Sequence, residues 1–135
     1  MKNIHIAHGS GGGMTRALVK DLFMDCFSNE YLLEQADGAV LGAEQGRTVF
    51  STDSHVIDPI FYPGGDIGKL AVAGTVNDIA VMGAKPRYLS CGFILEEGFE
   101  ISLLERIARS MAETAEKDGV AIVTGDTKVV KKGAC

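Results

Sequence analysis

The stretch from Arg87 to Thr127 decides the fold: RYLSCGFILEEGFEISLLERIARSMAETAEKDGVAIVTGDT. Residues 87–96 are rich in Tyr, Leu, Cys, Phe and Ile, and this composition predicts a strand. A helix is expected next, because Ser102 and Glu105 have the spacing of a capping box. Five apolar residues at helical spacing form its predicted buried stripe: Leu104, Ile107, Ala108, Met111 and Ala115.

The predicted helix ends at Gly119, where a glycine after the last turn is typical, and a short buried strand is expected at 120–124. Upstream, Asp66 is expected to cap a helix, buried nearly all round, that runs to Met82 and is closed by Gly83. Another strand is predicted over residues 47–54. This alternation predicts an α/β or α+β domain with a mixed sheet covered by helices.

The N-terminal part of the chain is expected to begin with a short extended piece over residues 4–8. A glycine loop follows at Gly9–Gly13, and the apolar spacing after it predicts a helix over roughly residues 14–27. Residues 28–47 are predicted to be irregular, since glycines interrupt them.

The 135 residues suit one domain, and 46% hydrophobic with 23% charged residues is ordinary for a globular protein. A net charge of −5 without a basic stripe argues against nucleic-acid binding. No apolar run approaches the roughly 20 residues that span a bilayer, so no membrane partner is expected. Without an apolar signal core at the N-terminus, a cytoplasmic location with reduced thiols is predicted.

Three aspartates are candidates for binding a metal ion. Asp53 and Asp126 follow predicted strands, at the ends where ligand-binding residues collect, and Asp78 lies in a largely apolar helix. Converging carboxylates would suit Mg²⁺ shared with substrate phosphates. The alternative is that Asp53 and Asp126 are turn residues and that a buried Asp78 bonds to backbone amides. Gly74 is also unusual, since glycine inside a helix costs about 1 kcal/mol relative to alanine.

The glycine loop precedes a helix, so its amides could surround an anion, although it lacks the Walker pattern. A mobile N-terminal arm is an equally good interpretation of this loop. Lys69 and Lys128 are the lysines nearest to the glycine and aspartate segments, so each could meet a phosphate or remain solvated. His8 could be a base or a ligand, but a lone histidine beside a loop is usually neither.

Several motifs together resemble the hydrogenase expression/formation HypE family, the carbamoyl dehydratases. The motifs, in chain order, are Ala7-His8-Gly9-Ser10-Gly11-Gly12, Thr52-Asp53-Ser54, residues 61–72 (FYPGGDIGKLAV), residues 74–78 (GTVND), residues 89–98 (LSCGFILEEG) and residues 123–130 (VTGDTKVV). The resemblance covers essentially the whole chain. The Asn-Asp helix and the Gly-Asp-Thr strand end are shared with the wider superfamily of aminoimidazole ribonucleotide synthetase.

The resemblance implies an N-terminal ATP-binding domain, residues 1–135, whose sheet is completed by dimerisation. It implies that Asp53, Asp78 and Asp126 hold Mg²⁺–ATP. Phosphate or metal contacts are implied for Asn77, Lys69, Thr127 and Lys128. The loop that closes over the nucleotide would be His8, Gly9, Ser10, Gly11 and Gly12.

The activity implied is maturation of nickel–iron hydrogenase. A carbamoyl group arrives on a cysteine thiol from the carbamoyltransferase HypF, ATP phosphorylates its oxygen, and loss of phosphate leaves a thiocyanate. The cyano group then passes to iron on a HypC–HypD scaffold complex. Two alternatives are a different ATP-dependent phosphoryl-transfer enzyme of the superfamily, and a non-catalytic module for dimerisation or partner docking.

The sequence departs from the family pattern at its end, because the family's C-terminal domain and its Pro-Arg-x-Cys tail are missing. The chain is therefore expected to be an N-terminal fragment that is inactive alone, with the catalytic residues in the missing part. Cys135 follows Lys-Gly-Ala rather than Pro-Arg-x, so it is not expected to be the acceptor thiol.

Overall fold

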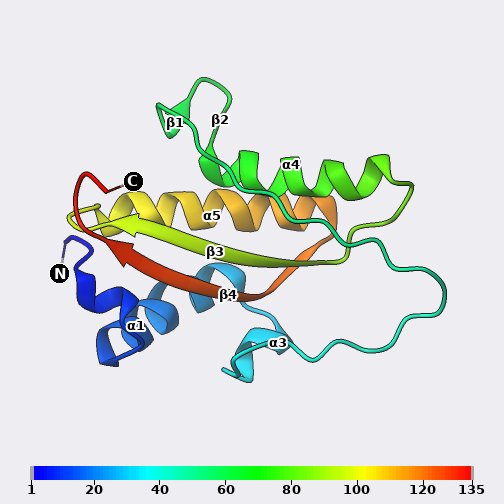
Figure 1. Ribbon diagram of the computed structural model, residues 1–135, viewed down its shortest axis with the longest axis horizontal. Helices are drawn as coiled ribbons and strands as arrows, with labels where there is room; N and C mark the ends of the chain where they lie inside the picture. The colour runs from blue at the N-terminus through cyan, green and yellow to red at the C-terminus, as the bar shows by residue number, and fades with distance from the viewer. Residues whose placement is uncertain (1, 135) are drawn as a thin grey trace.

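The computed structural model describes residues 2–134, in which helices alternate with two small pairs of strands (Figure 1). The order of elements is η1 (Ile6–Gly9), α1 (Gly13–Leu18), η2 (Val19–Phe23), α2 (Met24–Phe27), α3 (Glu30–Leu33), β1 (Phe61–Tyr62), β2 (Gly65–Asp66), α4 (Ile67–Val81), β3 (Tyr88–Glu96), α5 (Ile101–Asp118) and β4 (Ala121–Val130). β1 and β2 pair antiparallel, whereas β3 and β4 pair parallel. The predicted α/β class is confirmed.

The strand β3, the helix α5 and the strand β4 form one unit, as predicted. All five residues of the predicted stripe on α5 are buried, and Gly119 ends the helix with a φ of 68°. The capping box is wrong, because the helix begins earlier: the amides of Leu103 and Leu104 both donate to the carbonyl of Glu100. Ser102 Oγ instead donates to the Glu100 carboxylate at 3.3 Å.

β4 is longer than the sequence predicts, because it continues through Gly125 and Asp126 to Val130. Gly125 lies opposite Cys91 in the ladder, and a Cβ at Gly125 would collide with the Cys91 carbonyl oxygen. Gly125, which follows the predicted strand, therefore permits close strand pairing. Asp126 lies within the strand and not at its end.

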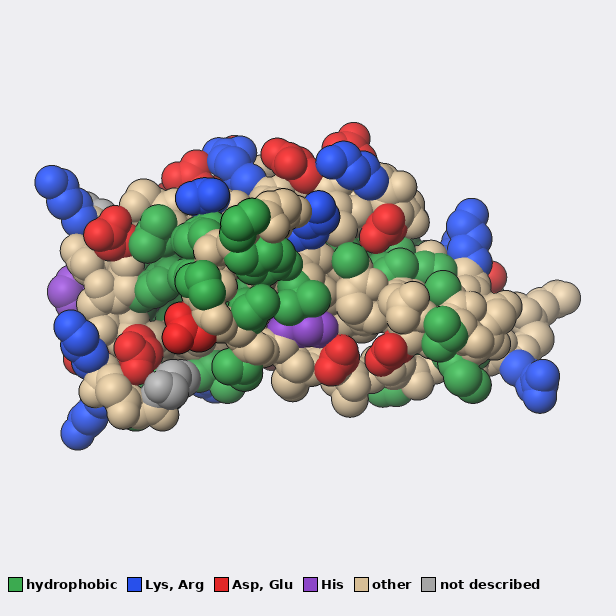
Figure 2. Space-filling model, turned by 90° about the horizontal axis from the view of Figure 1, so that it is seen from above, with side chains coloured by type: hydrophobic (Ala, Val, Ile, Leu, Met, Phe, Trp, Pro, Cys, Tyr) green, Lys and Arg blue, Asp and Glu red, His purple; other side chains and the backbone are tan. Residues whose placement is uncertain are grey.

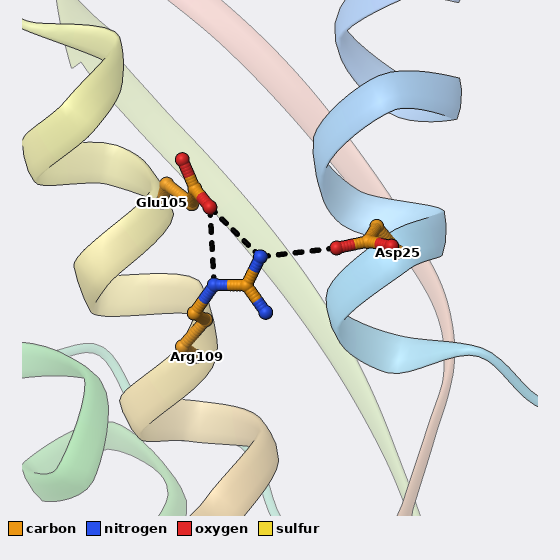
Figure 3. Close-up of polar contacts among 3 residues, drawn as sticks. All are labelled: Asp25, Glu105 and Arg109. Carbon is orange, nitrogen blue, oxygen red and sulfur yellow. Dashed lines mark hydrogen bonds and ion pairs between the residues drawn. The ribbon is translucent and has the colours of Figure 1, made fainter.

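The core lies between β3–β4, α5 and the N-terminal helices. The predicted helix over 14–27 is confirmed as a continuous helical run that includes α1, the π-helical turn η2 and α2. Phe23 of this run stacks on Phe93 of β3, with ring centroids 4.8 Å apart. On the surface, Arg109 of α5 donates to Glu105 at 2.8 Å and to Asp25 of α2 at 3.1 Å, which links the two helices (Figure 3).

Two predicted extended segments are wrong. Residues 6–9 form the 3-10 turn η1, which His5 and His8 cap. Residues 47–54 form no strand and belong to the long irregular connection between α3 and β1, which passes along the outside of α4 (Figure 1). Phe50, expected at the centre of a strand, is 91% exposed, because no neighbouring strand lies beside it to pair with.

The helix α4 begins where the sequence predicts, because the amide of Lys69 donates to Asp66 Oδ1 at 3.0 Å. α4 packs along α5, but the prediction that it is buried nearly all round is wrong. Val81 and Met82 are 72% and 69% exposed. Figure 2 looks onto the face with α4 and shows hydrophobic side chains gathered there. No helix within residues 2–134 has both the length and the apolar character needed to traverse a bilayer.

Candidate functional site

Two of the three predicted aspartates lie where the segment 51–55 crosses α4. Asp78 is on α4, and its Oδ2 accepts a hydrogen bond from Ser51 Oγ at 3.4 Å. Asp53 pairs with His55, whose Nε2 lies 3.1 Å from Asp53 Oδ2. His55 rests against α4 at Gly74, one helical turn before Asp78. The segment therefore runs in the opposite direction to the helix. Asp53 lies between its two contacts, which are Ser51 with Asp78 and His55 with Gly74.

The surroundings of these two carboxylates differ from the sequence-based alternatives. Asp78 is half-buried, and its side chain accepts a hydrogen bond from the Ser51 hydroxyl. Asp53 Oδ1 accepts the amide of the next residue, Ser54, at 2.8 Å, and not the amide two residues on that a turn-forming aspartate accepts. The Asp53 side chain is 40% exposed, so solvent reaches it. Both groups offer the oxygen donors that Mg²⁺ prefers.

Asp126 lies apart from this pair, on the exposed side of β4. Lys128 Nζ lies 2.8 Å from its Oδ2 and 2.9 Å from its Oδ1. The hydrogen bond from this ammonium group, together with one from the Thr127 backbone, holds the pKa of Asp126 below its ordinary value. The prediction that Asp126 lies at a strand end is wrong, and Thr127 beside it is buried with 7% exposure.

No group of three His, Cys, Asp or Glu side chains within residues 2–134 has the arrangement of a metal site. Asp78 thus lies on α4, Asp53 lies on the segment that crosses α4, and Asp126 lies on β4, paired with Lys128. The donor chemistry fits Mg²⁺ at Asp53 and Asp78, and the third carboxylate is not part of this cluster in the isolated chain.

The glycine loop packs beside β4, near the end where Lys128 lies. A Cβ at Gly9 would be 2.5 Å from the Val129 amide nitrogen, so only glycine permits this approach. His8 is buried, and its Nδ1 accepts the amide of His5 at 2.9 Å. The remaining loop residues make local bonds: Ser10 Oγ donates to the Ala7 carbonyl, the Gly11 amide donates to Thr15 Oγ1, and Gly12 is the N-cap of α1.

The other predicted contact residues are spread along α4. Lys69 in its first turn is exposed and donates through Nζ to the Gly64 carbonyl at 2.9 Å. Asn77 is exposed, next to Asp78. Sequence reasoning missed Ser51 and His55, although both lie two residues from Asp53, a spacing that places side chains on one side of an extended segment. Cys135 lies outside the described residues.

Comparison with known proteins adds to this geometry. Residues 35–135 match the family described as AIR synthase related protein, N-terminal domain. The chain belongs to this family. It is 60% identical to the carbamoyl dehydratase HypE of Escherichia coli (strain K12), over 99% of the chain and 41% of that protein. The resemblance to HypE predicted from the motifs is thereby confirmed.

Solved structures agree with this assignment. The fold matches a crystal structure of the hydrogenase maturation protein HypE in complex with ATP, with a TM-score of 0.93 and 55% identity, over 96% of this chain and 38% of that one. It also matches a crystal structure of a HypE–HypF complex, with a TM-score of 0.61 and 50% identity, over 87% of this chain and 38% of that one. The chain spans about two-fifths of the length of the relatives it matches.

Proposed function

We propose that residues 1–135 are the ATP-binding N-terminal domain of a carbamoyl dehydratase of nickel–iron hydrogenase maturation. The observation that carries the proposal is the match, over 96% of the chain, to HypE crystallised with ATP. The whole enzyme would convert a cysteine-bound thiocarboxamide into a thiocyanate. The oxygen removed leaves as phosphate, and ATP is converted to ADP. The catalytic residues of the whole enzyme are expected outside this chain.

The nucleotide would bind over Asp53 and Asp78 and over the glycine loop. Asp53 and Asp78 are proposed to hold Mg²⁺, because they place carboxylate oxygens on two adjoining stretches of chain. Asp126 is proposed as the third carboxylate, which must release Lys128 or share it with a phosphate. Bound Mg²⁺ would offset negative charge on the phosphates during transfer.

Several other residues are proposed to contact the nucleotide. Lys69 and Asn77 lie on α4 on the exposed side, where a phosphate can reach them. Thr127 and Lys128 follow Asp126 on β4. Gly9 lies against the same strand, and the loop residues His8, Gly9, Ser10, Gly11 and Gly12 would close over the nucleotide.

The chain is also proposed to form a homodimer that extends its sheet. Phe50 and Val56 are 91% and 96% exposed on a segment without strand partners, and Ile94 of β3 is 68% exposed. A second copy placed against these side chains would cover apolar surface that a monomer leaves in water. In the cell we propose a cytoplasmic protein that works with HypF, which the solved complex of a relative supports, and with a HypC–HypD scaffold.

The same exposed side chains favour a second function, a docking or dimerisation module without catalysis. Light scattering on the purified chain tests it, and a strictly monomeric chain would exclude the dimerising form. Binding of Mg²⁺–ATP by the chain would show that it does more than dock.

The nucleotide proposal is tested by calorimetric titration of the chain with ATP, with and without Mg²⁺. The Asp78→Asn variant keeps the shape of the side chain but removes its charge, so we expect Mg²⁺-dependent binding to be lost. Asp118→Asn, the same change at an exposed position at the end of α5, is the matched control and should bind like wild type. Equal affinity in Asp78→Asn and wild type would refute the site.

A further inference from the structure

Gly74 in the middle of α4 has a specific neighbour. A Cβ at this position would lie 2.7 Å from His55 Nε2, closer than such atoms approach in proteins. Glycine is a poor residue inside a helix, so its presence here needs a reason. In this structure the reason is space: because Gly74 has no side chain, the edge of the His55 imidazole can pack against the helix backbone there.

The seated ring has a polar partner. The His55 side chain is only 13% exposed, and its Nε2 lies 3.1 Å from Asp53 Oδ2. An Nε2–H tautomer donates to this oxygen, while the Ser54 amide donates to Oδ1 at 2.8 Å. Each carboxylate oxygen keeps a further lone pair for a cation. The two hydrogen bonds therefore fix the direction of the Asp53 carboxylate without using up its capacity to bind.

The surrounding segment also contacts α4 through Ser51. Residues 51, 55 and 57 are half-buried, whereas residues 52, 53, 54 and 56 between them are exposed. Ser51 donates to Asp78 and His55 lies against Gly74, so these two contacts flank Asp53. Loss of the His55 contact would remove one of the two contacts that flank Asp53.

We propose that His55, seated against Gly74, is a positioning residue that aims the Asp53 carboxylate at the cation of Mg²⁺–ATP. This rests on the proposed function, in which Asp53 is a metal ligand. Partners that orient a metal-binding carboxylate or imidazole affect metal affinity about 10–100-fold when removed. Gly74 acts through His55 and touches no ligand.

The decisive variant is Gly74→Ala. The added methyl displaces the ring, which can swing away because it is the end of a flexible side chain, and alanine favours the helix. We therefore expect Mg²⁺–ATP affinity to fall about tenfold in calorimetry while the melting temperature stays equal or rises. A merely structural role of Gly74 would lower the melting temperature as well.

Three further variants isolate His55. His55→Ala should weaken Mg²⁺–ATP binding about as much as Gly74→Ala, and the double variant should bind no more weakly than either. His55→Gln, whose amide can donate from a similar position, should bind more like wild type than like His55→Ala. Gly42→Ala adds a methyl with no atom within 4 Å and is the matched control.

The outcomes separate this inference from the proposed function. If wild type binds Mg²⁺–ATP, Asp78→Asn does not, and Gly74→Ala binds like wild type, the role of His55 is refuted and the nucleotide site stands. If adding Gly74→Ala to His55→Ala lowers the affinity for Mg²⁺–ATP further, the role of His55 is also refuted. Gly74 would then affect binding by a route that does not involve His55. If wild type itself does not bind, the proposed function and this inference both fall.

Discussion

The contact between α4 and α5 makes the replacement Gly68→Ala the most informative stability test. Gly68 is buried in the first turn of α4, where the helix leans on α5. A Cβ there would lie 2.5 Å from the Ile107 carbonyl oxygen and 2.9 Å from Met111 Cγ. Met111 can rotate, but the backbone oxygen of α5 cannot. The methyl group can be accommodated only if the two helices move apart.

The size of the effect follows from this geometry. The Cβ–oxygen distance is about 1 Å short of a comfortable separation of roughly 3.5 Å. Overpacking of a tight core typically costs 1–3 kcal/mol, and a rigid backbone neighbour places this case near 3 kcal/mol. Alanine regains about 1 kcal/mol of helix propensity. The free energy of unfolding should therefore fall by about 2 kcal/mol, or the melting temperature by roughly 6 °C.

Thermal and urea denaturation followed by circular dichroism measure this change. Gly42→Ala, which meets no atom within 4 Å, should stay within about 0.5 kcal/mol of wild type. Gly74→Ala is a useful comparison, because its methyl group meets a movable side chain, whereas the methyl group of Gly68→Ala meets backbone. Gly74→Ala should therefore not lower the melting temperature. A Gly68→Ala protein as stable as wild type would show that α4 and α5 do not approach as closely as described.

Three further predictions concern buried and surface groups. Burial raises the pKa of the Cys91 thiol to about 11 from an ordinary value near 9. The stability that the protonated thiol contributes is therefore complete below pH 9 and is lost as the pH rises toward 11. The free energy of unfolding should fall by about 2–3 kcal/mol across this interval, measured against a Cys91→Ala protein that lacks the effect. Asp66→Ala should cost about 1 kcal/mol in urea denaturation, since the cap of α4 is lost; an unchanged midpoint would contradict the cap. Asp25→Asn should cost at most about 1 kcal/mol, less in high salt, and nothing in an Arg109→Ala background, as a double-mutant cycle would show.

Local sequence signals predicted the elements whose structure depends on near neighbours. The stripe from Leu104 to Ala115 requires only helical spacing, and Asp66 caps α4 through an amide three residues away. The same signals failed at Ser102, because the helix already begins at Ile101, with Glu100 as its N-cap. They also failed at Gly125, where a turn-forming residue serves strand pairing instead.

In the candidate site, too, local sequence signals identified some residues and missed those that depend on contacts between distant segments. Asp53 and Asp78 were found from their residue types and motifs, but their partners Ser51 and His55 were not. A strand over residues 47–54 was predicted from composition alone, and composition cannot supply the neighbouring strand that a ladder needs. Without that neighbour the segment lies on α4, and its Ser51 and His55 side chains contact the helix instead.

The sequence by itself determined the α/β class, the long helices α4 and α5, strand β3, and the membership that the motifs indicated. These depend on short-range periodicity, capping and turn chemistry, which each segment carries in its own residues. Only the tertiary structure decided that His55 meets Gly74, that Asp126 pairs with Lys128 away from the other two aspartates, and that Gly68 brings α4 onto α5. Such contacts join segments that are remote in sequence or depend on the direction of side chains in a strand, and they are set by packing of the whole core.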